Sequence, residues 1–341
     1  MDKREVIKMV LDGKVPPYVP WEVSFTYEPG EMLKKHFSCK DLHQFLDNHM
    51  AVFGSSEGFF TDIGGGRVKD VFGVIWDRSV EKSIGNVEGV VLKEPTLKNF
   101  IFPSPDDPVF YRSMHEKINN YSRHFKVYAI GFSLFERAWT LRGMENLMMD
   151  MIERPEFVHE LLTKIADFNI KVLKKALAYD IDGIHFGDDW GQQHGLIMGP
   201  KLWYEFIYPQ VKRMYKVGKD AGKYVSIHSC GDVDELFSDL NAAGLNCFNP
   251  FQPEVMDTEA LLNTYRGKLS FWGGLSTQKI LPYGSADEVR AECRRLFKIG
   301  IKGGYIFSPA HAVPSDVPLE NIQAFIEEMQ SQPEYKKLKT S

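Results

Sequence analysis

The sequence predicts an α/β protein: a (β/α)8 TIM barrel with an N-terminal helical elaboration, forming a single domain over residues 1–341. Two observations lead to this class. In the second half of the chain, short apolar, β-rich runs alternate six times with longer segments. Many of the short runs end in polar clusters. The alternation indicates a parallel sheet covered by helices, and polar groups at the carboxyl ends of its strands are typical of the active-site face of a barrel.

The expected strands are rich in β-branched and aromatic residues. They are Lys126–Phe132, Gly183–Gly187, Tyr224–His228, Cys247–Pro250, Leu269–Gly273 and Gly304–Ser308. Between them, apolar residues recur with a period near 3.6 residues, which predicts helices. These helices are Pro155–Tyr179, Pro200–Ala221 and Ala286–Ile299. Pro155 and Pro200 fall where a first helical turn tolerates proline.

The first 125 residues are less periodic. Pro20–Phe25 and Val74–Trp76 are expected to be strands, and the segment between them is expected to be helical elaboration at the barrel mouth. Three consecutive glycines, residues 64–66, do not make a dinucleotide-binding motif, because Lys69 occupies the position of its third glycine. We therefore predict a turn at these glycines.

The composition excludes several classes of protein. With 41 Lys and Arg against 46 Asp and Glu, the net charge is −5, which disfavours a nucleic-acid partner. Four scattered cysteines are too few for a disulfide scaffold and favour a reducing, cytoplasmic location. The charged start, MDKREVIKMVLDGK, does not resemble a signal peptide, and no apolar run is long enough to span a membrane.

His228 and Cys230 form the sharpest chemical pattern. Side chains at positions i and i+2 of a strand point to the same face, so these two are expected to project together at the end of the strand Tyr224–His228. An imidazole beside a thiolate is half of a tetrahedral zinc site. The simpler alternative is a small buried cysteine beside a capping histidine.

Further ligands would have to come from other strand ends. His311 is the best candidate for a third metal ligand, and a pocket-lining histidine is its alternative. Asp188 and Asp189 are candidate catalytic acids, alternative oxygen ligands, or helix N-caps. Glu136 is a candidate catalytic group, or else forms a structural ion pair with Arg137.

Neutral polar and aromatic side chains at the strand ends are candidate substrate contacts. The polar ones suit a neutral polar ligand, and the aromatic ones suit an apolar wall for an aromatic or methylated substrate, although core packing is the simpler interpretation. They are Asn249, Gln252 and Gln278, and Trp190, Phe251 and Trp272. His185 lies in an apolar run and is predicted to be a core histidine.

At these residues the chain resembles the uroporphyrinogen decarboxylase superfamily, which also contains zinc-dependent cobalamin methyltransferases. The motifs that carry the resemblance are FERAW (135–139), GDDWG (187–191), HSCGD (228–232), NPFQP (249–253), WGGLSTQ (272–278), GGYIFSPAH (303–311) and VPLEN (317–321). The resemblance implies a (β/α)8 barrel, in agreement with the alternation of strands and helices.

The resemblance also discriminates between functions within the superfamily. Porphyrinogen decarboxylases carry an N-terminal arginine motif that holds propionate groups, whereas this chain has Glu22 there and no arginine between Arg4 and Arg67. A substrate with eight carboxylates needs cations in its pocket. The methyltransferase branch binds zinc through a His-x-Cys pair and a later cysteine. His228 and Cys230 match the pair, and His311 stands where the later cysteine is expected.

The implied chemistry is methyl transfer through a corrinoid carried by a separate protein, because the chain lacks a D-x-H-x-x-G corrinoid motif. We favour transfer from a small methylated substrate, an aryl methyl ether, to cobalt. The alternatives are methyl transfer from methylcobalamin to a thiol, a cofactor-free decarboxylase, and a non-catalytic binding relative. A homodimer is an open expectation.

Overall fold

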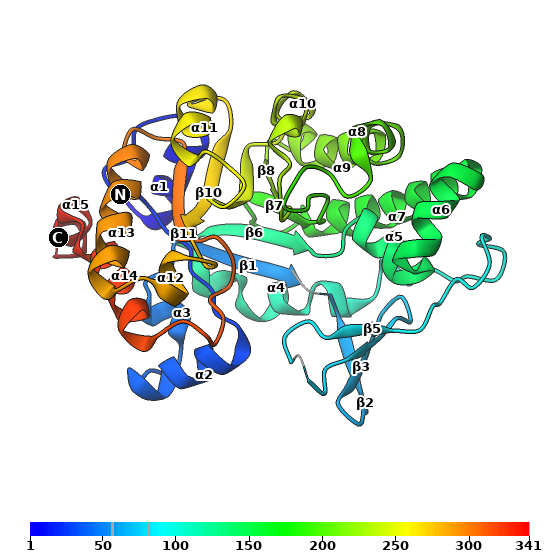
Figure 1. The fold of residues 1–341 in the computed structure, drawn as a ribbon, viewed down its shortest axis with the longest axis horizontal. Helices are drawn as coiled ribbons and strands as arrows, with labels where there is room; N and C mark the ends of the chain where they lie inside the picture. The colour runs from blue at the N-terminus through cyan, green and yellow to red at the C-terminus, as the bar shows by residue number, and fades with distance from the viewer. Residues whose placement is uncertain (56–57, 81, 341) are drawn as a thin grey trace. The chain divides into compact units, whose positions relative to one another are not determined.

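The structure is a computed structural model that describes residues 1–55, 58–80 and 82–340 (Figure 1). The chain packs into two compact units, each built from more than one stretch of sequence. Unit 1 comprises Met1–Ala51, Tyr121–Phe125 and Asn246–Ser341, and unit 2 comprises Val52–Asn120 and Lys126–Leu245. The prediction that the chain is a single domain stays a prediction.

Parallel strands form the centre of unit 2. They are β1 (Met50–Ser55), β6 (Phe125–Ile130), β7 (Gly183–Gly187) and β8 (Tyr224–His228), and they neighbour one another in that order. The β6–β7 and β7–β8 pairs are parallel. Most residues of β6, β7 and β8 are buried, as expected for strands with helices on one face and a core on the other. The predicted strands at 183–187 and 224–228 are confirmed residue for residue.

Helices follow each of these strands. They are α4 (Arg112–Lys117), α5 (Phe135–Arg142), α6 (Met144–Glu153), α7 (Pro155–Ala176), α8 (Gly199–Leu202), α9 (Tyr208–Asp220) and α10 (Phe237–Ala243). Short 3-10 turns lie at Pro108–Phe110, Ile118–Tyr121 and Asp234–Leu236. The single helix predicted over 200–221 is interrupted by a π-helical turn, Trp203–Ile207. Pro209 has no N–H to donate to the preceding turn, which accounts for the altered hydrogen-bond register.

The segment between residues 25 and 74, for which the sequence predicts helical elaboration, contains the helices α2 (Tyr27–His36) and α3 (Leu42–Phe45) but also several strands. Unit 2 contains an antiparallel sheet with the order β2 (Phe60–Gly64), β3 (Arg67–Asp70), β4 (Ile75–Asp77) and β5 (Asn86–Glu88). The three glycines form the β2–β3 turn, each with positive φ, so the predicted turn is confirmed. The expected strand Val74–Trp76 overlaps β4 and is shifted from it by one residue. The other strands of the sheet were not predicted, because they are short and half-exposed, which leaves little alternation of apolar and polar residues.

Unit 1 contains β9 (Cys247–Phe251), β10 (Ser270–Leu275) and β11 (Tyr305–Pro309), paired in parallel in that order. Its helices are α1 (Lys3–Leu11), α2 (Tyr27–His36), α3 (Leu42–Phe45), α11 (Thr258–Tyr265), α12 (Ile280–Tyr283), α13 (Ala286–Gly300), α14 (Leu319–Ser331) and α15 (Pro333–Thr340). A capping box of Ser285 and Glu288 starts α13 where the sequence predicts a helix.

Pro20–Phe25 forms no continuous strand, which corrects the prediction. Trp21 and Phe25 make only isolated parallel bridges, to Phe307 and Val313. Pro20 has no N–H to donate, so this segment contributes only part of a ladder. Within the described residues, none of the helices combines the length and the apolar character needed to cross a bilayer.

Candidate functional site

The ends of β7 and β8 remain paired beyond the strands themselves. Gly187 is the register partner of His228. After that pair, the Asp188 N–H donates to the His228 carbonyl at 2.9 Å, and the Gly191 N–H donates to the Cys230 carbonyl at 3.2 Å. The motifs GDDWG and HSCGD therefore continue the parallel sheet as two hydrogen-bonded segments within unit 2.

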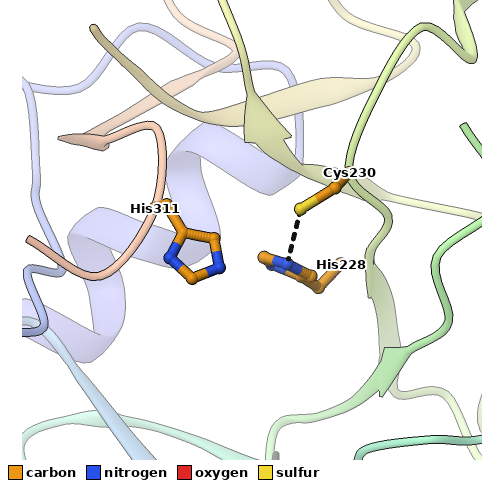
Figure 2. Close-up of side chains that lie close together, drawn as sticks. All are labelled: His228, Cys230 and His311. Atoms are coloured by element: carbon orange, nitrogen blue, oxygen red, sulfur yellow. Dashed lines mark hydrogen bonds between the residues drawn. The ribbon is translucent and has the colours of Figure 1, made fainter. Parts of the chain in front are cut away.

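His228 and Cys230 lie on the same face, as their i, i+2 spacing predicts. The Nε2 atom of His228 and the Sγ atom of Cys230 are 3.3 Å apart, and both side chains are partly exposed (Figure 2). Zinc bonded to an imidazole nitrogen and a thiolate at tetrahedral angles would hold these atoms about 3.5 Å apart. The nitrogen–sulfur pair therefore fits a zinc ion with little rearrangement.

Asp188 is fully buried and fixes the start of helix α5. Its Oδ1 accepts hydrogen bonds from the N–H groups of Leu134 and Glu136 at 3.0 and 2.9 Å, and its Oδ2 accepts from that of Phe135 at 3.0 Å. The Trp190 indole N–H donates to the same Oδ2 at 2.5 Å. Burial raises the pKa of Asp188 to about 6, although these hydrogen bonds favour the ionised form. Of the interpretations proposed from the sequence, helix capping describes this geometry.

Glu136 and Asp189 are the partly exposed acids of the cluster. Asp189 accepts a hydrogen bond from the Cys230 N–H, with its Oδ1 2.8 Å from that nitrogen. Burial raises the pKa of Glu136 well above its usual value, and the charges of Asp189 and Asp188 raise it further. Burial, followed by the same kind of repulsion from Asp189 and Glu136, raises the pKa of the Cys230 thiol. A bound cation would favour the thiolate in this acidic surrounding.

Arg137 does not serve Glu136 as the sequence alternative suggested. Its guanidinium forms a buried ion pair with Asp70, with Nη1 2.5 Å from Oδ2, and lies over the ring of Phe72. Arg137 therefore pairs with Asp70, and Glu136 belongs to the acid cluster with Asp188 and Asp189. His185 is buried, with its Nδ1 2.9 Å from the Ser226 hydroxyl oxygen, and burial lowers its pKa to about 3. It is the core histidine that the apolar run predicts.

The predicted substrate contacts fall into buried and accessible groups. Trp190 in unit 2 and Phe251 in unit 1 have no exposed surface, and Phe251 stacks on Phe271 with ring centroids 4.4 Å apart. Core packing, the simpler interpretation, therefore describes both. Gln278 is exposed and Trp272 is partly exposed.

The two remaining predicted contacts are buried amides of unit 1. Asn249 and Gln252 lie in β9 and directly after it, and Asn249 donates from Nδ2 to the Trp272 carbonyl at 2.9 Å. Both residues lie at or near the end of a strand, as the sequence predicts, but their contacts do not identify a ligand. Their role as substrate contacts stays a prediction.

His311 follows β11 in unit 1 by two residues, and its side chain is exposed. Figure 2 labels it with His228 and Cys230, and the dashed line joins the two residues that belong to unit 2. The role of His311 as third metal ligand stays a prediction, as do the catalytic roles of the acids.

Sequence reasoning missed Ser229 and the glycines that fit the two segments together. The Trp190 N–H donates to the Ser229 hydroxyl at 3.1 Å, and the backbones of Gly191 and Gly231 are in close contact. The available signal was a glycine directly after each polar strand end, at positions where a side chain has no room.

Comparison with known proteins agrees with this architecture. The sequence matches the family "Uroporphyrinogen decarboxylase (URO-D)" over residues 127–332, so the chain belongs to that family. A uroporphyrinogen decarboxylase of Carboxydothermus hydrogenoformans is 25% identical over 258 residues, covering 70% of each chain. Another, from Christiangramia forsetii, is 22% identical over 242 residues, covering 68% of this chain and 67% of the relative.

A solved structure shares the fold. It is a methyltransferase from Methanosarcina mazei, with a TM-score of 0.74 and 14% sequence identity, over 97% of this chain and 98% of the other. At this identity the likeness shows the fold alone. With the parallel strands and their connecting helices, it confirms the predicted α/β barrel class.

Proposed function

We propose that this protein is a corrinoid-dependent methyltransferase that moves a methyl group from a small methyl ether to the cobalt of a separate corrinoid protein. The observation that carries the proposal is the pair formed by His228 Nε2 and Cys230 Sγ, 3.3 Å apart at the end of a barrel strand. In barrels of this kind, reacting groups gather at the carboxyl ends of the strands. The methyltransferase of like fold adds support by analogy.

In the proposed reaction, cobalt(I) of the corrinoid substrate supplies the electron pair of a new carbon–cobalt bond and is oxidised to cobalt(III), while the bond between the methyl carbon and the oxygen of an aryl methyl ether breaks. The electron pair of the broken bond stays on the oxygen, which then takes a proton, so the products are a methylated corrinoid and a phenol. We propose that His228, Cys230 and His311 hold zinc, which supplies a Lewis acid for the negative charge that develops on the leaving oxygen.

The acids of the cluster divide into two roles in this proposal. Asp188 is buried and has both oxygens occupied, so we assign it to positioning α5. Glu136 and Asp189 are partly exposed and lie near Cys230, so we assign them to moving the proton that the leaving oxygen takes. Trp272 and Gln278 are the proposed contacts with the aromatic substrate.

The test combines metal content with methyl transfer. We expect the purified protein to contain about one zinc per chain, and to lose it in His228→Ala and Cys230→Ala. His311→Ala losing zinc as well would identify the third ligand. With zinc bound, the protein should methylate cob(I)alamin from an aryl methyl ether. A protein that takes up no added zinc, or that methylates cobalamin from no ether tested, contradicts the proposal.

Decarboxylation is the second candidate, because the curated relatives reported above are named uroporphyrinogen decarboxylases. Charge argues against it. At the position of the N-terminal arginine motif, the carboxyl group of Glu22 is buried and accepts the Met50 N–H at 2.8 Å, so this position offers no cation to a propionate. Incubation with uroporphyrinogen and measurement of released CO2 separates the two candidates: release at an enzymatic rate would favour the decarboxylase.

A further inference from the structure

The segments 188–192 and 228–232, which we call the strand-end clasp, are joined by hydrogen bonds from one end to the other. Five of these bonds come from main-chain N–H groups of one segment and end on the other segment, and four of them are 3.1 Å or shorter. They are Asp188 N to His228 O (2.9 Å), Trp190 N to Ser229 Oγ (3.1 Å), Cys230 N to Asp189 Oδ1 (2.8 Å) and Asp232 N to Gln192 O (2.7 Å). Gly191 N to Cys230 O, at 3.2 Å, completes the set.

Two glycines allow the segments to come this close. A Cβ added to Gly191 would lie 2.6 Å from the Cys230 carbonyl oxygen and 2.8 Å from the Gly231 carbonyl carbon. A Cβ added to Gly231, whose φ is +87°, would lie 2.4 Å from the Gly191 carbonyl carbon. Both neighbours are main-chain atoms, so no side-chain rotation could relieve the contact. Any larger residue at position 191 must move the peptide that carries Cys230.

We propose that the clasp is a positioning element, in which Gly191, Gly231 and Ser229 set the separation of the His228 and Cys230 side chains before a metal binds. The inference rests on the proposed function, because it takes these two residues as ligands. It gives the GDDWG motif a positioning role, through its backbone and through the Asp189 side chain that accepts the Cys230 N–H, beside the proton transfer proposed for Asp189.

The physical reason is preorganisation. Cys230 lies beyond the last residue of β8. A loop that follows a strand without hydrogen-bond partners would sample many conformations. The clasp fixes the peptide groups on both sides of Cys230, and the His228 nitrogen and the Cys230 sulfur lie 3.3 Å apart on this hydrogen-bonded backbone. Groups that orient ligands without touching the metal typically change metal affinity by roughly 10–100-fold when they are removed.

The experiment compares Gly191→Ala with Gly218→Ala. Gly218 is a matched control in the same unit: a Cβ there would lie 2.8 Å from Ile184 Cδ1 in β7 and 2.9 Å from Val225 Cγ2 in β8. It crowds the same two strands from helix α9, away from the clasp. Zinc affinity is measured by competition with a chelator, and ligand geometry by the visible absorption of the Co(II)-substituted protein, both below the melting temperature of each variant.

We expect zinc binding roughly 10–100-fold weaker in Gly191→Ala, with an altered Co(II) spectrum, and wild-type values in Gly218→Ala. Ser229→Ala removes one clasp hydrogen bond without a clash, so it covers the case in which Gly191→Ala does not fold. It should weaken zinc binding in the same direction. Wild-type affinity and spectrum in Ser229→Ala and in folded Gly191→Ala overturn the inference while leaving the proposed function intact. A wild-type protein that binds no zinc removes the proposed metal site instead.

Discussion

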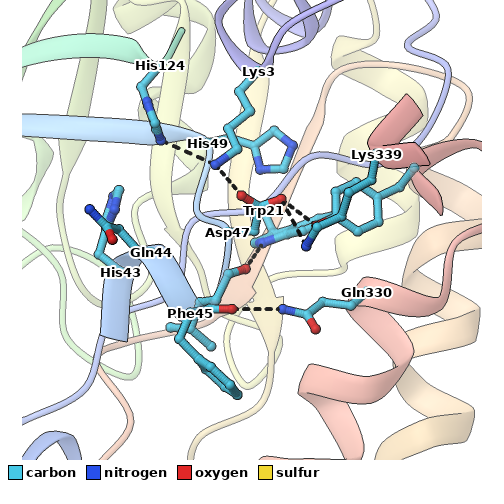
Figure 3. A network of polar contacts seen from close by, with 12 residues as sticks. Lys3, Trp21, His43, Gln44, Phe45, Asp47, His49, His124, Gln330 and Lys339 are labelled. Carbon is cyan, nitrogen blue, oxygen red and sulfur yellow. Dashed lines mark hydrogen bonds and ion pairs between the residues drawn. The ribbon is translucent and has the colours of Figure 1, made fainter. Parts of the chain in front are cut away.

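The buried carboxyl group of Glu22 predicts how the stability of the protein depends on pH. This carboxyl group is 8% exposed and accepts the Met50 N–H at 2.8 Å. Burial raises its pKa from 4.5 to about 8, although Lys3 and the His49 N–H favour the charged form. Figure 3 shows Lys3, His43 and His49 in the polar network of unit 1, and the Nε2 atom of His43 lies 3.7 Å from Glu22 Oε1.

The direction of the change in stability with pH follows from the number of protons that the folded and unfolded states bind. Folded Glu22 keeps its proton up to about pH 8, whereas the unfolded chain loses it near pH 4.5, so the folded state binds more protons between these values. Stability from this group is therefore complete below pH 4.5 and is lost as the pH rises through about 8. The free energy of unfolding falls by about 1.4 kcal/mol per pH unit between about pH 5 and the folded pKa near 8, and little above it. The loss between about pH 5 and about pH 9 is therefore about 4 kcal/mol.

Glu22→Gln removes this dependence, because the amide mimics the protonated acid and keeps an oxygen for the Met50 N–H. The free energy of unfolding, measured by urea denaturation at several pH values, should be similar for the two proteins near pH 5. Near pH 9 the variant should be more stable by about 4 kcal/mol. Glu116→Gln, which alters an exposed acid of α4, is the control and should show no such trend. If the difference between wild type and Glu22→Gln stays constant from pH 5 to pH 9, the reasoning is wrong.

Three other predictions follow from the same kind of argument. Asp188→Ala leaves the main-chain N–H groups at the start of α5 without an acceptor, and we expect it to lower the free energy of unfolding by about 2–4 kcal/mol in urea denaturation. Arg137→Met leaves Asp70 as a buried unpaired charge and should cost about 3–5 kcal/mol, whereas adding Asp70→Asn should recover part of the loss; equal losses in the single and double variants would contradict the ion pair. Chelation should lower the melting temperature of the zinc-bound wild type but not of Cys230→Ala, as measured by calorimetry, and an equal decrease in both would show that the effect does not come from this site.

Much of the fold was predictable from local patterns. Helices at 155–176 and 286–300 follow from apolar periodicity, and strands at 183–187 and 224–228 follow from short apolar runs bounded by glycine or charged residues. In the antiparallel sheet at 60–88, only the strand at 75–77 was predicted, within one residue. The stability of this sheet depends on pairing between short strands rather than on a pattern within each one.

The candidate site shows the same division. The alternation of side chains along a strand predicts that His228 and Cys230 lie together, and their separation of 3.3 Å in the structure agrees. Trp190 and Phe251 lie next to polar clusters in sequence, yet both are fully buried. Adjacency along the chain says which residues are near a strand end, but it does not say which of them keeps an exposed surface once helices cover the sheet.

The α/β barrel class, the family and the His-x-Cys pair could all be predicted from the sequence, because each leaves a pattern of residue types along the chain. The contacts of the acids became visible only in the folded structure. Asp188 became the anchor of α5 because N–H groups more than fifty residues away point at its oxygens. Asp189 became a support for Cys230 because β7 and β8 remain paired past their ends. A carboxylate takes its role from the donors and charges around it, and those arrive only when the chain folds.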